Sequence, residues 1–122
     1  MTFVTSSNEM EEWEIFPGSK IRLAARGEKM TAVLSAWEPR SQSTLHSHPH
    51  EQVAFCLEGS MIFSIGDREY PVKKGDVVWI PANIRHNQRN EAEETAVFAE
   101  CFSPAREDLL GKKFAPGFSG KE

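Results

Sequence analysis

The segment His46-Ser47-His48-Pro49-His50-Glu51-Gln52 carries three of the four histidines of this 122-residue chain. The fourth histidine closes the segment Pro81-Ala82-Asn83-Ile84-Arg85-His86. In a strand, side chains two residues apart lie on one face, so His46 and His48 are predicted to point the same way. If the chain folds back in antiparallel strands, His86 can join them, and imidazole is a common ligand of zinc, copper, nickel and iron. The pattern therefore predicts a metal-centred binding or catalytic pocket.

The composition indicates a single soluble globular domain. The chain is 39% hydrophobic and 26% charged, and its length allows a hydrophobic core without disulfides. With a formal net charge of -4, it has no basic stripe for nucleic acid and no apolar stretch of about 20 residues that would span a membrane. The polar, acidic N-terminus does not resemble a signal peptide, so we expect a cytoplasmic protein. We predict one domain over residues 1–122, with its core at about 20–111 and peripheral termini.

The hydrophobic periodicity is mostly that of β-strands. Apolar, β-prone runs alternate with breaks at Gly, Pro, Asn or Asp. Glu58-Gly59, Gly66-Asp67 and Lys74-Gly75-Asp76 are predicted to form tight hairpin turns, because glycine permits the backbone that they need. Turns at such short intervals predict an all-β fold, a small antiparallel β-barrel or sandwich. The predicted strands cover residues 20–25, 31–38, 52–57, 60–65, 69–73, 76–80, 85–89 and 95–103.

One short helix is predicted near the C-terminus. Ser103 suits its N-cap and Pro104 its first position, and residues 105–110 follow. Gly111 is expected to end it. At the other end, residues 1 to about 12 are expected to be loosely held or to pair with a partner subunit.

Two segments resemble the paired motifs of the cupin superfamily. The first motif is G-x5-H-x-H-x3,4-E-x6-G, and the matching residues are His46, His48 and Gly59, with Gln52 at the glutamate position and Arg40 at that of the first glycine. The second is G-x5-P-x-G-x2-H-x3-N, matched by Gly75, Pro81, His86 and Asn90, with Asn83 at the middle glycine. Asparagine tolerates a left-handed backbone better than most residues, so this last change is mild. The resemblance implies a small β-barrel of the cupin type (jelly roll).

The fourth metal ligand is implied by the resemblance. Strict alternation along the histidine segment would bring His50 to the ligand face, but Pro49 breaks the pairing, after which the face of each residue is not predictable. The cupin pattern selects Gln52, with Glu51, His50 or solvent as alternatives. The implied site is one divalent ion, nickel, zinc, iron or manganese, on His46, His48, Gln52 and His86. Four neutral ligands should leave a strong Lewis acid that favours an anionic ligand.

A second group of candidate residues follows the last predicted strand. Within residues 95–103, Glu100 and Phe102 share one face. A carboxylate in an otherwise apolar strand is costly unless it is paired or exposed. Arg106 can turn back to pair with Glu100 or to hold a substrate carboxylate with two hydrogen bonds. The alternative is a surface Glu100–Arg106 pair with Phe102 in the core.

The signature F-S-P-x-R-x-D, which begins at Phe102, is similar to that of small cupins related to the pectin-degradation protein KdgF, as is the run His-Ser-His-Pro-His-Glu-Gln. Proteins of that group convert 4,5-unsaturated uronates to open-chain 5-keto-4-deoxyuronates. The resemblance implies that Glu100, Phe102 and Arg106 are catalytic residues. The group typically has Asp where this chain has Glu100, whose extra methylene alters the geometry of proton transfer.

The sequence therefore predicts a metal-dependent enzyme acting on a small, anionic, sugar-acid-like substrate. Glu100 would act as general acid/base, Arg106 would steady a carboxylate, and Phe102 would pack against the ring. One barrel hosts many reactions, so an iron-dependent dioxygenase and a non-catalytic small-molecule-binding or sensor protein are the alternatives. The expected partners are a small-molecule carboxylate and, because three tryptophans exceed what one small core obviously needs, a second copy of the chain.

Overall fold

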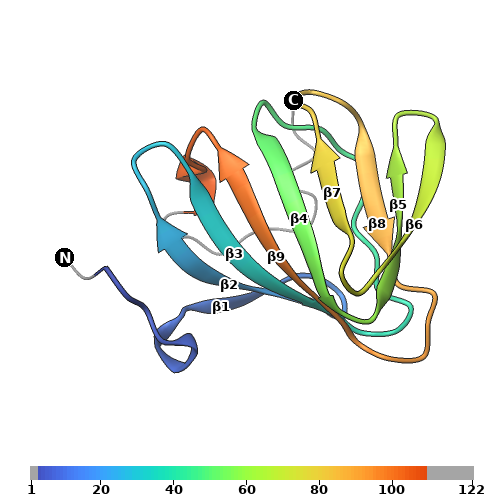
Figure 1. Ribbon diagram of the computed structural model, residues 1–122, viewed down its shortest axis with the longest axis horizontal. Helices are drawn as coiled ribbons and strands as arrows, with labels where there is room; N and C mark the ends of the chain where they lie inside the picture. Colours follow the sequence, from blue (N-terminus) through green and yellow to red (C-terminus); the bar gives the residue numbers. More distant parts are fainter. Residues whose placement is uncertain (1–2, 110–122) are drawn as a thin grey trace.

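The computed structural model describes residues 3–109, which form two antiparallel β-sheets. The larger sheet has the strand order β1-β2-β3-β9-β4-β7, and the smaller one β6-β5-β8. Figure 1 shows the larger sheet sweeping from β1 to β7, with β5, β6 and β8 beside it. The predicted all-β antiparallel fold is confirmed. The elements are η1 (Ser7–Glu9), β1 (Glu12–Phe16), β2 (Ser19–Arg26), β3 (Thr31–Trp37), β4 (Glu51–Glu58), β5 (Ser60–Ile65), β6 (Arg68–Lys73), β7 (Val77–Ile80), β8 (His86–Arg89), β9 (Ala96–Ser103) and η2 (Glu107–Leu109).

The inner faces of the two sheets meet in the hydrophobic core. Phe63 on β5 and Phe98 on β9 are fully buried, and their ring centroids lie 5.6 Å apart. Every second residue of β9 from Ala96 to Phe102 is buried, as alternation along a half-covered strand requires. Glu100 and Phe102 therefore share the inward face, as predicted.

The core begins earlier in the chain than the sequence indicated. No strand was predicted at residues 12–16, yet β1 pairs with β2 and brings Trp13 opposite Ile21. Trp13, Ile15 and Phe16 are buried. Their alternation with exposed glutamates is the period-2 signal of a half-buried strand.

Two of the three predicted hairpin turns are corners between the sheets. β4 pairs with β7 and β9, whereas β5 pairs with β6 and β8, so the chain changes sheet at Gly59. It changes back at Gly75, between β6 and β7. Of these three glycines, Gly66 alone closes a hairpin, between β5 and β6. At Gly59, φ is +77° and a Cβ would lie 2.8 Å from the carbonyl oxygen of Thr95, so this corner requires glycine. A turn residue marks where a strand ends but not which strand it pairs with next.

The predicted C-terminal helix is not formed over its first residues. Ser103, the expected N-cap, is the last residue of β9, and up to residue 109 the 3-10 turn η2 is the only helical element that follows. The N–H of Arg106 donates to Oγ1 of Thr31 at 2.8 Å, which holds this segment against β3 in a non-helical path. Gly111, the expected helix end, lies outside the described residues. Within residues 3–109, no helix is long and apolar enough to cross a membrane.

Two motif positions that carry glycine in the resembled pattern have a left-handed backbone here. Asn83 has φ = +70° and Arg40 has φ = +73°. The N–H of Asn83 donates to the carbonyl of His48 at 2.8 Å, so this loop helps to hold the histidine segment. The N–H of Arg40 donates to the carbonyl of Asn90 at 2.8 Å, which fixes the second position.

Replacing Asn83 tests the backbone requirement. Asn83→Ala should lower the free energy of unfolding by about 1 kcal/mol, because a left-handed L-residue without a polar side chain is strained. Asn83→Gly should be neutral or slightly stabilising, because glycine has no Cβ clash there. Thermal unfolding should place the alanine variant about 4 °C below the glycine variant. Equal midpoints for the two variants would show that the loop relaxes and does not need this conformation.

Candidate functional site

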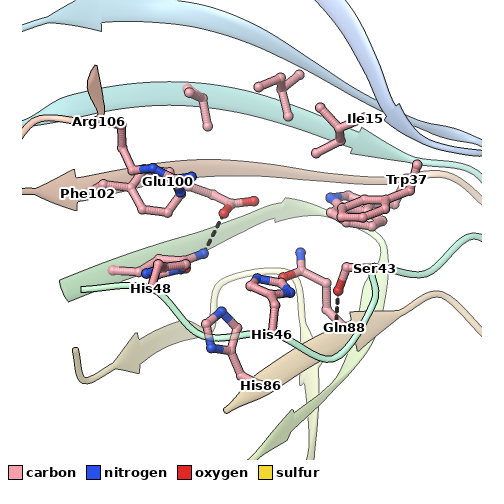
Figure 2. Close-up of a pocket in the computed structure, with 14 residues that line it drawn as sticks. Ile15, Trp37, Ser43, His46, His48, His86, Gln88, Glu100, Phe102 and Arg106 are labelled. Carbon is pink, nitrogen blue, oxygen red and sulfur yellow. Dashed lines mark hydrogen bonds between the residues drawn. The ribbon is translucent and has the colours of Figure 1, made fainter. Parts of the chain in front are cut away.

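The three motif histidines converge on one point. His46 and His86 form an isolated antiparallel bridge, in which each backbone N–H donates to the other residue's carbonyl, at 3.0 and 2.8 Å. His48 lies two residues further on, in the loop before β4. One nitrogen of each ring lies within 4.8 Å of the others, and all three residues are buried. Figure 2 shows the three rings facing one another. The segment that carries His46 and His48 is a bridged loop between β3 and β4, outside the regular strands.

Backbone carbonyls determine which ring nitrogen faces the centre. Nδ1 donates in each case, from His46 to Thr44 at 2.6 Å, from His48 to His50 at 2.9 Å and from His86 to Ile84 at 2.9 Å. A neutral imidazole that donates from Nδ1 carries its lone pair on Nε2. Such carbonyl partners are the usual orienting contacts of metal-binding histidines.

The protonation state of the histidines also suits metal binding. Burial, followed by the charge of His86, lowers the pKa of His46 to about 4. Burial, followed by the charge of Arg106, lowers the pKa of His48 to about 4. Both imidazoles are therefore neutral at neutral pH, the form in which histidine binds a metal ion.

Gln52 presents its amide oxygen to the histidines. Its Nε2 donates to Oε1 of Glu100 at 2.7 Å, so its Oε1 is turned toward His48 Nε2, 3.1 Å away. In the neutral ring these two atoms are both acceptors, and no proton lies between them. A metal ion bound by both His48 Nε2 and Gln52 Oε1 would turn this repulsive contact into a favourable one. The residues present therefore fit a metal ion, as the cupin resemblance implies.

Glu51 and His50, the alternatives to Gln52, are not part of the histidine cluster. Glu51 is exposed, and its Oε2 accepts a hydrogen bond from Trp79 Nε1 at 2.7 Å on the outer side of the sheet. His50 is half-buried and is not among the three histidines whose ligand atoms cluster. The backbone carbonyl of His50 accepts from His48 Nδ1 and orients that ring, so His50 contributes to the site through its backbone.

Glu100 is a buried carboxylate at the end of a hydrogen-bond chain. Trp37 Nε1 donates to Ser35 Oγ at 3.0 Å, and the Ser35 hydroxyl donates to Glu100 Oε2 at 2.6 Å. With Gln52 on Oε1, both carboxylate oxygens accept a hydrogen bond. Burial raises the pKa of Glu100 above its ordinary value, although Ser35, Gln52 and the charge of Arg106 act to lower it. A carboxyl group of this kind can exchange a proton closer to neutral pH than an exposed one.

Arg106 is buried beside Phe102 and paired with an acid from its own segment. Its Nε and Nη2 donate to Asp108 at 3.1 and 2.6 Å, and its guanidinium lies 4.8 Å from the centroid of the Phe102 ring. The exposed Glu100–Arg106 pair considered from the sequence is absent, since both residues are buried. Burial acts to raise the pKa of Asp108, but the hydrogen bonds and charge of Arg106 outweigh it and hold that pKa below its ordinary value.

These groups line one pocket. Its cavity volume of about 50 Å³ is small, and the pocket opens to solvent. Figure 2 shows Arg106 and Phe102 toward one end and Ile15 and Trp37 toward the other. The apolar lining comes from Ile15, Phe16, Ile21, Val33, Trp37 and Phe102, and the polar lining from Ser43, His46, His48, Gln52, His86, Gln88, Glu100 and Arg106.

Residues 33–102, more than half of the chain, match the Cupin_2 model of the cupin domain. The chain belongs to the cupin family. Two solved cupin structures superpose on this cupin over 90% of its length. One is an RmlC-like cupin from Shewanella frigidimarina, with a TM-score of 0.83, 22% identity and 97% of that chain covered. The other is KdgF from Halomonas sp., with a TM-score of 0.82, 21% identity and 100% of that chain covered. At these identities the likeness establishes the fold.

Curated relatives match shorter parts of this cupin. Over 48 residues it is 40% identical to acireductone dioxygenase 1 of Vitis vinifera, which covers 35% of this chain and 26% of that protein. Over 51 residues it is 33% identical to an uncharacterized protein of Methanocaldococcus jannaschii, which covers 41% of each. The match therefore spans about a quarter of the dioxygenase and two-fifths of the other relative.

Several residues in and around the pocket were not predicted from the sequence of this cupin, among them Ser35, Trp37 and Gln88. Ser35 on β3 donates to Glu100, Trp37 on β3 donates to Ser35, and Gln88 lies on β8 two residues after His86. Strand spacing does carry a signal for Gln88, because residues two apart share a face. Ser35 and Trp37 are brought toward Glu100 by the pairing of β3 with β9, which the sequence does not reveal.

Proposed function

We propose that this cupin is a metal-dependent enzyme that acts on a small, anionic sugar-acid-like substrate, opening the ring of 4,5-unsaturated uronates. The observation that carries the proposal is the buried Glu100 carboxylate, which is 2.7 Å from the amide nitrogen of Gln52 while the oxygen of that amide faces His48. A group that can exchange a proton is thereby held beside the candidate metal ligands. The structural likeness to KdgF supports the same reading.

The proposed ion is a divalent metal on His46, His48, Gln52 and His86. When bound, it would supply a Lewis acid of full charge, because all four ligands are neutral. The carbonyls that accept from the three Nδ1 atoms would keep the ligand rings oriented.

The remaining site residues would bind and orient the substrate. Arg106 would hold the substrate carboxylate, and Asp108 would fix the plane of its guanidinium through the contacts at 3.1 and 2.6 Å. Phe102, which is 6% exposed and lies against Arg106, would pack against the sugar ring. The apolar wall at the other end of the pocket would exclude water from the reacting atoms.

The reaction is an isomerisation that needs no co-reactant. Glu100 would take the proton of the C1 hydroxyl, and the C1=O double bond would form as the bond between C1 and the ring oxygen breaks. The ring oxygen would leave C1 as the enolate oxygen on C5. Transfer of the same proton from Glu100 to C4 would convert this enolate to the 5-keto-4-deoxyuronate, so atoms and electrons balance. Ser35 and Gln52 would hold the Glu100 oxygens in place during both transfers.

The direct test uses fresh unsaturated galacturonate and follows the absorbance of its 4,5-double bond. Metal-loaded protein should speed the loss of this absorbance over buffer, and chelator-treated protein should not. A metal-loaded protein that matches the buffer rate would rule out this activity.

The match to acireductone dioxygenase supports a second candidate function, an iron-dependent dioxygenase on the same ligands. Iron-loaded protein would then consume oxygen when given acireductone, which an oxygen electrode measures. Tight binding of a carboxylate with no turnover in either assay would favour the third candidate, a non-catalytic small-molecule-binding or sensor cupin.

Replacing Arg106 should affect substrate binding more than the chemical step. Arg106→Lys loses the two-pronged contact with a carboxylate, so we expect KM to rise by roughly 10- to 100-fold with a smaller change in kcat. Asp108→Asn should have a weaker effect in the same direction, because Arg106 then keeps a hydrogen-bonding partner without a charge. Initial rates over a range of substrate concentrations measure both, with Arg85→Lys on the exposed surface as the matched control. A fall in kcat at unchanged KM would place Arg106 outside carboxylate binding.

We also propose that two copies pair through the outer face of β4 and β7. Phe55, Val77 and Trp79 are 42%, 57% and 60% exposed, and Phe55 pairs directly with Val77 across the two strands. Exposed apolar side chains that gather in this way mark interaction surfaces. Light scattering after size exclusion should give a dimer mass for the wild type and a monomer mass for Val77→Lys, and a monomeric wild type would contradict the pairing.

A further inference from the structure

The side-chain nitrogen of Gln88 is a buried donor that lacks an acceptor. Gln88 is 4% exposed, and its Nε2 makes no hydrogen bond with any group in residues 3–109. Its backbone is firmly held, because its N–H donates to Ser43 Oγ at 3.0 Å and its carbonyl accepts from the Ser43 N–H at 2.9 Å. The missing partner is therefore not explained by a loose strand. Buried polar groups nearly always have partners, so an unpaired donor in a pocket indicates that a ligand provides one.

Gln88 faces the same space as Glu100. Both line the pocket, and Figure 2 shows Gln88 extending into it from β8 while Glu100 enters from β9. A weak hydrogen-bonding contact from Gln88 is the smallest of the effects that lower the pKa of Glu100, and the Gln88 nitrogen does not reach standard hydrogen-bond geometry. The two side chains therefore lie near each other in the pocket, but no hydrogen bond of standard geometry joins them.

The chemistry of the two groups defines what could lie between them. An amide N–H can only donate, and a carboxylate can accept a proton. A hydroxyl oxygen meets both conditions, because it accepts from the amide and donates to the carboxylate. A methylene group at the same place would leave Gln88 unpaired, which a binding site disfavours.

We infer that Gln88 is a substrate-binding residue whose Nε2 donates to the substrate oxygen that exchanges its proton with Glu100. The identity of that oxygen, the C1 hydroxyl of a uronate, rests on the proposed function. As this hydroxyl becomes a carbonyl, it keeps its lone pairs and therefore its contact with Gln88. The residue would then select a ligand that has oxygen at this position as well as a carboxylate.

The test compares Gln88→Leu with the wild type, and the same substitution at exposed Gln42 is the matched control. Calorimetry gives Kd for D-galacturonate, a saturated and unreactive analogue, and for acetate, which has the carboxylate but no hydroxyl. Gln88→Leu should weaken galacturonate binding by roughly 3- to 10-fold, the usual effect of one hydrogen bond, and leave acetate binding and metal content unchanged. Without ligand, its melting temperature should equal or exceed that of the wild type, because an unpaired buried donor has been removed.

The outcomes separate this inference from the proposed function. If Gln88→Leu leaves the galacturonate-to-acetate ratio of Kd values unchanged, the inference is wrong, even where unsaturated galacturonate is still converted. If the wild type binds no galacturonate and converts no uronate, the proposed function is wrong. The melting temperature of ligand-free Gln88→Leu, compared with the wild type, then shows whether Gln88 is a ligand-binding or a structural residue. A higher melting temperature of Gln88→Leu would support a role of Gln88 in binding another ligand that contains oxygen. A lower one would show that Gln88 is structural.

Discussion

Replacing Glu100 with glutamine is expected to lower kcat for uronate ring opening by roughly 10²- to 10⁴-fold, the usual contribution of a positioned acid/base group. The amide keeps the size of the side chain but cannot take a proton. Its oxygen can still accept from Gln52, and Ser35 can rotate its hydroxyl to accept from the new amide nitrogen, so the local hydrogen bonds are retained. Metal content, melting temperature and KM should therefore stay near the wild-type values while the absorbance assay shows the lost turnover.

Glu100→Asp is the matched control for this prediction. It keeps the carboxylate and moves it back by one methylene, toward the residue typical of the KdgF group. If the carboxylate is the group that transfers the proton, this variant should keep measurable activity where Glu100→Gln has almost none. A glutamine variant with wild-type kcat would remove Glu100 from the mechanism.

Removing His46 and His48 together is expected to abolish metal binding. The remaining imidazole and amide cannot hold an ion tightly, because each lost ligand removes a bond that solvent replaces only weakly. Metal added at 100 to 1,000 times its Kd should stabilise the wild type by about 3–4 kcal/mol. The double alanine variant should gain nothing. Elemental analysis of protein purified without a histidine tag, together with melting curves with and without metal, measures both effects.

His50→Ala provides the control in the same segment. Its backbone carbonyl, which orients His48, is unchanged by the substitution. This variant should therefore bind as much metal as the wild type. Equal metal content in the wild type and the double variant would mean that the ion is held elsewhere or not specifically.

The sequence predicted those features that depend on local periodicity. Alternation placed Glu100 and Phe102 on one face, and both are buried on the inner side of β9. The Asn83 position was expected to tolerate a left-handed backbone and has φ = +70°. The grouping of the motif histidines, predicted from spacing, is present as a buried cluster.

Features that depend on long-range pairing were not predictable in the same way. The glycines at positions 59 and 75 end strands as expected, but whether the next strand joins the same sheet depends on contacts far along the chain. The helix expected after Ser103 is replaced by a path that Thr31, on another strand, holds in place. Ser35 reaches Glu100 only because β3 lies beside β9. Each case involves a partner more than ten residues away, which local propensity does not encode.

The indole of Trp37 has an optical consequence. It is 3% exposed, lines the pocket and is joined to the Glu100 carboxylate through a single hydroxyl. A ligand or ion that changes the charge beside this carboxylate also changes the electric field on the ring, and with it the emission wavelength. In the single chain Trp79 is 60% exposed, so iodide in solution can quench its emission there while the emission of the buried Trp13 and Trp37 persists. The protein therefore carries its own fluorophore for titrating the pocket without a label.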